Sequence, residues 1–491
     1  MQPWLDDACS LVDAVRRREV RATDALEASL SAISASKTNA VVHLDADGAR
    51  RQAETIDRRI AAGEDAGAFG GVPLLVKDLE NVKGMPTTHG SVVYKDNIAE
   101  YDSIHVERLR AAGAVIVGKT APSEFGFVGY TSTKLHGVTR NPWNLERTPA
   151  GSSGGSAAAV AGGLTPLATA SDGGGSIRLP AAYCGLIGMK GTFGRIPRGP
   201  RSRTGQLTSL WGTTARSVRD AARWYDVTTG YHPRDALSLP RIDGWERDLG
   251  TRALKGLRVA VVPDLTCAVV HPEVERIVSD AAEALVAAAG LSRVAADIRL
   301  PEGGTSWATA GAPGLFADLK PFWPDCKDDL TFEVRFGMQS MEGYRVWHAA
   351  SAERFRMEMN EAMADMFEQV DIILSAVSPV EPFAAEGPMP RKVGDLDVNP
   401  YNGGALTIPA SISGYPAISI PAGLSESGLP IGLQAMTRRH DDALLLDLAL
   451  IMERTRPWPL VAPNAPIKPA GQSLCLLSPA ACSITSAKTR S

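Results

Sequence analysis

Short apolar segments that alternate with helical segments constrain the fold of this chain more than any other feature. The run at 71–77 (GVPLLVK) is typical of a buried strand, and the segments at 114–117 and 164–171 have the same character. Residues 102–109 and the small-residue stretch that follows Gly154 favour helices. Because strands and helices alternate in this way, the first half of the chain predicts an α/β fold with a largely buried sheet.

The same alternation continues in the second half of the chain. The segment 257–264 (LRVAVVPD) favours a strand, 273–290 favours an amphipathic helix, and 351–369 favours a longer helix. The pattern therefore extends the α/β prediction over most of the sequence. Further strands are expected at 371–374, 417–421 and 431–436.

The sequence indicates a single large domain. It contains no internal repeat and no obvious linker, because glycine and proline are spread evenly along it. We expect this domain to cover 1–467. The segment 468–491 turns into Ser, Ala and Cys without periodicity and is expected to be a poorly ordered tail. Near the other end, 23–35 predicts an amphipathic helix with Thr23 as its N-cap.

The composition is that of an ordinary globular protein. Hydrophobic residues make up 44% and charged residues 22%, and the net charge of -4 gives no support for nucleic-acid binding. The 6 cysteines are scattered without a C-x-x-C pair, which indicates free thiols rather than a disulfide framework or a zinc site. Residues 1–20 lack an apolar signal-peptide core, and no stretch reaches the roughly 18 apolar residues of a membrane-spanning helix. We therefore expect a soluble, cytoplasmic protein without an integral membrane segment.

A phosphate-binding motif can be set aside on physical grounds. Gly113-AVIV-Gly118-Lys119-Thr120 fits the pattern G-x-x-x-x-G-K-[ST]. In a phosphate-binding loop the four middle residues form an open loop whose amides contact the phosphate. Here these residues are Ala, Val, Ile and Val, which favour a strand, so no nucleotide site is predicted.

A second motif gives a rival hydrolase hypothesis. The run 151–155 (GSSGG) satisfies G-x-S-x-G, so Ser153 could be the nucleophile of an α/β-hydrolase-like esterase. That arrangement needs a strand directly before the serine, and 145–150 (LERTPA) makes a poor central strand. It also needs an acid and a later histidine. His232, His271, His348 and His440 are available, none of them in a distinctive context.

Three adjacent glycines before Ser176 give the stronger hypothesis. The N–H groups of Gly173, Gly174 and Gly175 can turn toward one point, because glycine has no side chain to prevent it. Aimed at a carbonyl oxygen, these N–H groups make an oxyanion hole beside a nucleophilic hydroxyl. Taken singly, such runs can also be turns.

The same constellation includes an upstream lysine and a second serine. Lys77 ends an apolar strand, and Ser152 lies in the other glycine-serine run. Taken singly, Lys77 could pair with Asp78 and Ser152 could cap a helix. Their combination with the Ser176 run makes a stronger constellation than any one of them alone.

This combination closely resembles the amidase signature family. The resemblance begins with GVPLLVKDLENVKGMPTTHGS at 71–91 and includes GAVIVGKT at 113–120 and TRNPWN at 139–144. It is most specific at 151–190, GSSGGSAAAVAGGLTPLATASDGGGSIRLPAAYCGLIGMK, and closes with weaker matches at 413–423 and 428–435. The resemblance implies one α/β domain with a mixed, twisted, mostly buried sheet flanked by helices.

The resemblance also implies a mechanism. The family motifs place the nucleophile at Ser176, a bridging serine with a cis peptide bond at Ser152, and the base at Lys77. A lysine acts as a base only when neutral, and burial lowers the pKa of a lysine by disfavouring its ammonium form. The implied activity is cleavage of carbon–nitrogen amide bonds, with carbamates and esters also possible substrates. The resemblance implies no metal and no organic cofactor, and we expect a monomer or homodimer.

Three classes of relative are considered. A free-standing amidase for small, aryl or alkyl amides is favoured. The glutaminase subunit of a tRNA-dependent amidotransferase complex is the alternative, but that subunit usually carries Tyr-Gly and Ser-Ser-Leu-Asp stretches where 190–220 differs. The intact set of Lys77, Ser152 and Ser176 argues against a non-enzymatic binding module.

The resemblance further implies the walls of the substrate pocket. The segment 124–131 should line its mouth, with Phe125, Gly126, Phe127 and Tyr130 in contact with substrate, although these aromatic side chains could equally be core. Residues 300–345 match the family least and are expected to add substrate-specific walls. That segment contains a cluster of aromatic residues that includes Trp307, Phe316, Trp323 and Phe336.

Overall fold

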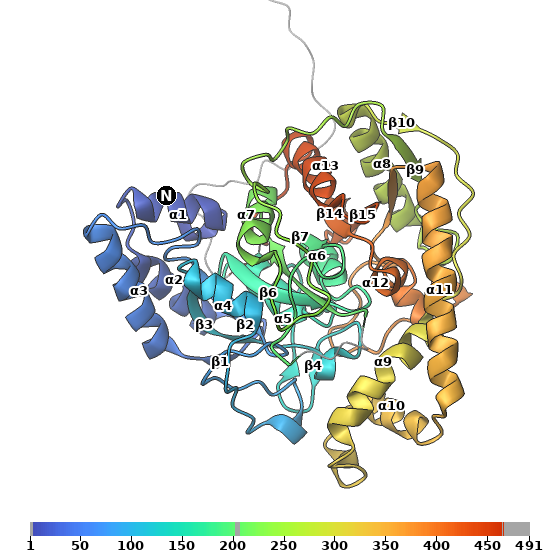
Figure 1. Cartoon of the computed structure of the whole chain (residues 1–491), viewed down its shortest axis with the longest axis horizontal. Coiled ribbons are helices and arrows are strands. Elements are labelled where there is room, and N and C mark those ends of the chain that lie inside the picture. Colours follow the sequence, from blue (N-terminus) through green and yellow to red (C-terminus); the bar gives the residue numbers. More distant parts are fainter. Residues whose placement is uncertain (1–2, 202–206, 464, 466–491) are drawn as a thin grey trace, which may run out of the picture.

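The computed structural model describes residues 3–201, 207–463 and 465. Within these residues an eleven-stranded mixed sheet runs through the middle of the molecule (Figure 1). Parallel pairing joins β3 to β2, β2 to β6, β11 to β9 and β9 to β10, and the other neighbours are antiparallel. In spatial order the strands are β1 (Val41–Leu44), β3 (Val115–Thr120), β2 (Pro73–Lys77), β6 (Leu167–Asp172), β8 (Leu210–Ala215), β7 (Ile187–Lys190), β14 (Ala417–Leu424), β15 (Pro430–Thr437), β11 (Ile372–Ala376), β9 (Arg258–Val261) and β10 (Ser292–Arg293).

Helices surround this sheet. The N-terminal helices gather beside the β1-β3-β2 end, at the left of Figure 1, and α5 and α6 pack against the central strands. α7, α13 and α8 follow one another along β8, β7, β14 and β15. These helices are α1 (Ala8–Arg16), α2 (Ala22–Ala35), α3 (Ala46–Ala61), α4 (Ile104–Ala111), α5 (Gly154–Ala161), α6 (Arg178–Cys184), α7 (Val218–Thr228), α8 (Pro272–Ala289), α12 (Ile408–Ser413) and α13 (Asp442–Thr455).

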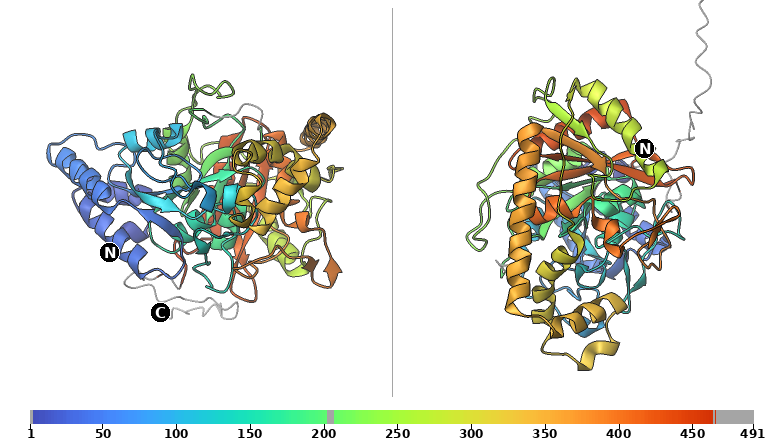
Figure 2. Two further views of the ribbon diagram at one scale, coloured as in Figure 1. Left: turned by 90° about the horizontal axis from the view of Figure 1, so that it is seen from below. Right: turned by 90° about the vertical axis from the view of Figure 1, so that its right-hand side faces the viewer.

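Three further helices form an outer layer on the opposite side of the molecule from α1–α3. The long helix α11 (Val346–Gln369) packs on α12 and on α9 (Gly304–Leu319), and α10 (Phe332–Glu342) packs on α9 (Figures 1 and 2). The smaller elements are β4 (Ser132–Thr133), β5 (Gly137–Val138), β12 (Lys392–Val393), β13 (Leu396–Asp397), η1 (Pro3–Leu5), η2 (Val92–Tyr94), η3 (Glu124–Gly126), η4 (Asp325–Asp328) and η5 (Pro400–Gly404).

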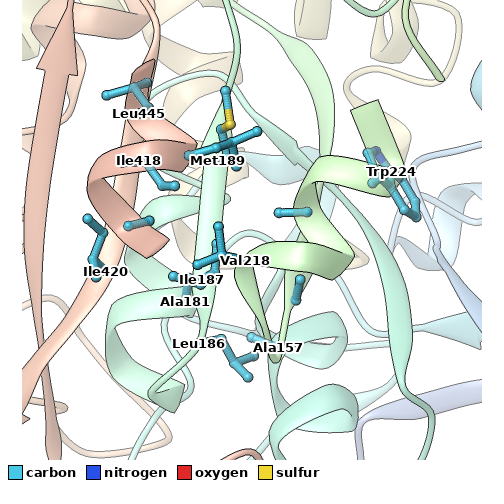
Figure 3. Packing of buried hydrophobic residues seen from close by; sticks show 14 of the residues in the cluster. Ala157, Ala181, Leu186, Ile187, Met189, Val218, Trp224, Ile418, Ile420 and Leu445 are labelled. Atoms are coloured by element: carbon cyan, nitrogen blue, oxygen red, sulfur yellow. The ribbon is translucent and has the colours of Figure 1, made fainter. Parts of the chain in front are cut away.

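The main hydrophobic core fills the spaces between sheet and helices. Figure 3 shows Ile187 and Met189 of β7 and Ile418 of β14 among side chains of the neighbouring helices. Trp224 of α7 is fully buried, and Leu445 of α13 packs in the same cluster. Burial at this density makes the core sensitive to the loss of even a few methylene groups.

The structure confirms the predicted α/β fold and most predicted elements. The strand that begins at Val115 runs through Lys119 to Thr120, so all but the first two residues of the phosphate-loop pattern lie in a strand. The predicted Thr23 cap is wrong: Arg21 is the N-cap residue of α2, and the Thr23 hydroxyl donates to Asp57 of α3 at 2.8 Å. The tail predicted at 468–491 lies outside the described residues. No helix in the described part of the chain is long and apolar enough to cross a membrane.

The core packing makes a testable prediction about stability. Ile418→Ala should lower the free energy of unfolding by about 2–5 kcal/mol, because Ile418 is fully buried and its truncation leaves a cavity. The matched control Ile242→Ala, at a side chain that is 42% exposed, should change it by no more than about 0.5 kcal/mol. Urea unfolding followed by circular dichroism measures both changes, and equal midpoints for the two variants would contradict the described core.

Candidate active site

Three segments bring the candidate residues together at one edge of the sheet. Lys77 ends β2 and Ser171 lies near the end of β6, and these strands are parallel neighbours. The third segment is the turn that carries Ser152 and Ser153 directly into α5. Because parallel strands present their carboxyl ends at the same edge, the lysine and these serines converge there.

Lys77 is fully buried and contacts three serine hydroxyls. Its Nζ lies 2.9 Å from Ser152 Oγ, 2.7 Å from Ser153 Oγ and 2.9 Å from Ser171 Oγ. Asp78 does not pair with Lys77, contrary to the simpler alternative. The Asp78 carboxylate instead accepts hydrogen bonds from Thr88 and lies 3.8 Å from Lys119 Nζ.

Burial lowers the pKa of Lys77 to about 7, although the negative charges of Glu80 and Asp172 oppose this shift. Near neutral pH a large fraction of Lys77 is therefore the free amine, which has two N–H donors and one lone pair. Ser153 donates its hydroxyl proton to the carbonyl of Ser171. The Ser153 oxygen is thus an acceptor for Lys77, and the lysine lone pair can accept a proton from Ser152.

Ser153 occupies a structural position. Its side chain is fully buried, and it does not line the cavity described below. Residues 145–150 form turns and an isolated bridge instead of the strand that a nucleophile elbow requires. The peptide bond between Gly151 and Ser152 is cis.

The turn that carries Ser176 is held by a buried ion pair. Arg178 Nε and Nη2 donate to Asp172 at 3.0 Å each. Burial opposes ionisation of Asp172, but the charge and hydrogen bonds of Arg178 outweigh it and hold the pKa of Asp172 at about 2. Asp172 also accepts hydrogen bonds from the N–H groups of Gly175 and Ile177. The ion pair therefore fixes both sides of Ser176.

This arrangement corrects one predicted oxyanion donor. The Gly175 N–H donates to Asp172 Oδ1 at 2.8 Å, so it is already occupied. The carbonyls of the two preceding glycines are also held: Trp307 Nε1 donates to Gly173 and Thr407 Oγ1 donates to Gly174, each at 2.6 Å. In a trans peptide the N–H points opposite to the C=O. The bond from Trp307 therefore turns the Gly174 N–H away from the indole.

A cavity of about 210 Å³ lies over these groups. Ser152 and Ser176 both line it, as do Gly173 and Gly174. Its other lining residues are Leu79, His89, Phe125, Gly126, Phe127, Ser171, Thr208, Ser209, Trp307, Ala308, Gly311, Gly314, Leu315 and Asp318.

The predicted pocket residues divide into two groups. Phe125, Gly126 and Phe127 line the cavity as expected. Tyr130 does not, because its hydroxyl donates to Glu333 at 2.6 Å and its ring packs on Phe383. Of the four aromatic residues named above in the segment 300–345, Trp307 lines the cavity, and the expectation is wrong for the other three. Phe316 and Trp323 pack in an apolar cluster under α10, and Phe336 is exposed.

Several residues of the site were not predicted from the sequence. Ser171 directly precedes the Asp-Gly-Gly-Gly-Ser segment, and this position could have suggested a lysine contact. Asp172 and Arg178 flank the glycine run and could have been recognised as an ion pair. Thr407 was not foreseen, and neither was the bond from Trp307 to Gly173, since each bond to the glycine run joins segments far apart in the sequence.

A family model described as Amidase matches residues 24–446. The chain is 33% identical to an acylamidase of Rhodococcus erythropolis, over 93% of this chain and 96% of the relative. It is 34% identical to a glutamyl-tRNA(Gln) amidotransferase subunit of Synechococcus sp. (strain RCC307), over 93% of this chain and 98% of the relative.

The structure is similar to that of a bacterial aryl acylamidase of the amidase signature enzymes. The two superpose with a TM-score of 0.90 at 26% identity, covering 96% of this chain and all of the other. The chain belongs to the amidase signature family.

The glycine turn makes a second prediction. A Cβ on Gly174 would lie 2.7 Å from Trp307 Cζ2, so Gly174→Ala must displace the indole or the peptide that it holds. We expect kcat/KM to fall by about a hundredfold, since a displacement of about 1 Å at a reacting centre can cost that much. Gly311→Ala in the same cavity, where a Cβ meets nothing within 4 Å, is the matched control and should stay within a few-fold. Full activity of Gly174→Ala on a chromogenic anilide would contradict the described turn.

Proposed function

We propose that this chain is a free-standing serine amidase that hydrolyses amides of aryl or alkyl acids through an acyl-enzyme on Ser176. One observation carries the proposal: a buried lysine with a pKa of about 7 contacts Ser152, and Ser152 lines the same cavity as Ser176. A serine hydroxyl is a weak nucleophile and needs a base. The neutral amine of Lys77 supplies that base at physiological pH.

The proton path follows from the donor and acceptor inventory. Ser176 gives its proton to Ser152 as it attacks the substrate carbonyl, and Ser152 passes its own proton to the lone pair of Lys77. The developing oxyanion is stabilised by backbone N–H groups of the glycine turn, at roughly 3 kcal/mol per donor. Gly174 is the principal donor, because Trp307 holds the carbonyl of the same peptide on the other side.

Collapse of the tetrahedral intermediate reverses the path. The protonated Lys77 returns a proton through Ser152 to the leaving amine, and the carbon–nitrogen bond breaks. Water then replaces the amine, loses a proton along the same relay and releases the acid from Ser176. Carbamates and esters with the same acyl group can follow this route, because the relay acts on any leaving nitrogen or oxygen beside Ser152.

The residues that line the cavity favour an apolar acyl group over glutamine as the substrate. Phe125, Phe127, Trp307 and Leu315 provide apolar surface. Free glutamine carries an α-carboxylate, whose binding calls for a cation. Among the described residues that line this cavity, none is lysine or arginine. The similarity to an amidotransferase component keeps glutaminase as the second candidate, and turnover of free glutamine would favour it.

The nucleophile assignment is tested by serine substitutions. Ser176→Ala should reduce kcat by at least about 10⁴-fold with the fold intact, because no acyl-enzyme can form. Ser209→Ala is the matched control, since Ser209 lines the same cavity and has no role in the relay; its kcat should stay within a few-fold. Hydrolysis of an aryl amide, followed together with thermal melting, separates loss of chemistry from loss of fold. Substantial turnover by Ser176→Ala would refute the assignment.

The pH dependence tests the base. Since Lys77 acts as the free amine and its pKa is about 7, kcat/KM should fall about tenfold per pH unit below pH 7 and level off above about pH 8. Lys190, another buried lysine with a pKa of about 7, donates to the carbonyl of Tyr415 and lies outside the relay. Lys190→Met should therefore keep the inflection. A profile that stays flat from pH 5.5 to 9, or an inflection lost in Lys190→Met, would contradict the base assignment.

A further inference from the structure

A second, larger cavity adjoins the one that contains the serines. Its volume is about 630 Å³, and Leu79, His89, Ser209 and Asp318 line both cavities. We call it the second chamber; its remaining lining residues are Asn81, Tyr94, Asn97, Ile98, Ala99, Glu100, Tyr101, Ser103, Arg198, Gly199, Pro200, Arg201 and Trp211.

An aromatic cluster forms the partition between the two cavities. His89 stacks on Phe125 with ring centroids 6.0 Å apart and meets the edge of Tyr94 at 5.4 Å. Phe125 lines the first cavity and Tyr94 lines the second chamber, while His89 lines both. A substrate that passes this cluster therefore has one part in each cavity.

The second chamber presents hydrogen-bond donors. Arg198 is only 5% exposed and stacks over the Phe193 ring at 4.7 Å, while Asp235 accepts a hydrogen bond from its backbone N–H. Trp211 Nε1 is buried and has no acceptor within the described part of the chain. Arg198 and Trp211 line the chamber, and arginine and indole N–H groups only donate, so a ligand group that contacts either side chain must be an acceptor. At the rim, the exposed Arg201 and Glu100 lie 3.8 Å apart and offset each other's charge.

The position of Ser152 decides which half of the substrate enters this chamber. In the proposed function, Ser152 returns the proton to the leaving amine, so that amine must lie beside Ser152. A Cβ on Gly126 would lie 3.3 Å from Ser152 Oγ and 3.0 Å from Leu79 Cδ1. Leu79 is therefore next to the relay serine, and it also lines the second chamber.

We propose that the second chamber binds the leaving amine of the substrate, and that this amine carries an oxygen acceptor, above all a carboxylate, which Arg198 recognises. This inference rests on the proposed function, since it assigns a binding site to the leaving amine of the same reaction. The substrate class is then an N-acyl derivative of an amine with an acidic or carbonyl-bearing group, with its apolar acyl part against Phe127 and Trp307.

Three phenylacetyl amides with different leaving amines test the proposal: 4-(aminomethyl)benzoate, its carboxamide and 4-methylbenzylamine. The methylene insulates the reacting nitrogen, so the amines differ mainly at their far end. In the unsubstituted protein we expect kcat/KM to be at least tenfold higher for the carboxylate than for the methyl compound, with the carboxamide between them. Equal values, or the highest value for the methyl compound, would overturn the proposal.

Substitution of Arg198 tests whether the second chamber binds the leaving amine or the acyl part of the substrate. Arg198→Met should remove most of the carboxylate preference, and Arg198→Lys should keep part of it. Turnover of the methyl compound checks that each variant is folded. The leaving amine has already departed when the phenylacetyl-enzyme is hydrolysed, so the rate of that hydrolysis should be the same in both variants as in the unsubstituted protein. A parallel loss in that rate would place the acyl part in the chamber and refute the inference, whereas failure to form an acyl-enzyme with any of the three amides would instead refute the proposed function.

Discussion

The buried amine of Lys77 is the interaction on which the rest of the site depends. A lysine with no exposed surface is stable only if its polar atom is satisfied, and three serine hydroxyls from two segments do this at 2.7–2.9 Å. The same burial that requires these partners lowers the pKa of the amine to about 7. Burial at the end of β2 is thus the cause of both properties: it requires the hydrogen bonds that anchor the lysine, and it lowers the pKa so that the amine is a candidate base.

The turn that carries Ser176 is fixed by a buried ion pair between Asp172 and Arg178. Asp172 ends β6 one residue after Ser171, so the strand that contacts Lys77 also begins the glycine turn. Arg178 joins Asp172 to Gln434 of β15 and to α12, so strands from both halves of the sheet hold the turn in place. Trp307 and Thr407 then orient the peptides of the turn. The bonds of Arg178 to Gln434 and to α12, and those from Trp307 and Thr407, each connect segments more than a hundred residues apart.

The fold and the proposed catalytic residues were largely predictable because their signals are local. A few neighbouring residues are enough to predict strand 73–77, helix 154–161 and the glycine run before Ser176. Two of the failures have a common cause, which is a hydrogen-bond partner from elsewhere in the chain. The Thr23 hydroxyl donates a hydrogen bond to Asp57, and the Tyr130 hydroxyl donates one to Glu333. The Gly175 N–H donates to the nearby Asp172, whose orientation depends on Arg178. The contact between Lys77 and Ser171 depends on the register of β2 against β6, which no local pattern reports.

The central claim is that acyl transfer begins on Ser176 and depends on neutral Lys77. Its most direct test is intact-protein mass spectrometry with peptide mapping after reaction with a fluorophosphonate or a slowly hydrolysed aryl ester. The account predicts one adduct, on Ser176, which is absent from Ser176→Ala and forms far more slowly in Lys77→Ala. An adduct on Ser153 instead, or equally fast labelling of Ser176 without Lys77, would contradict it.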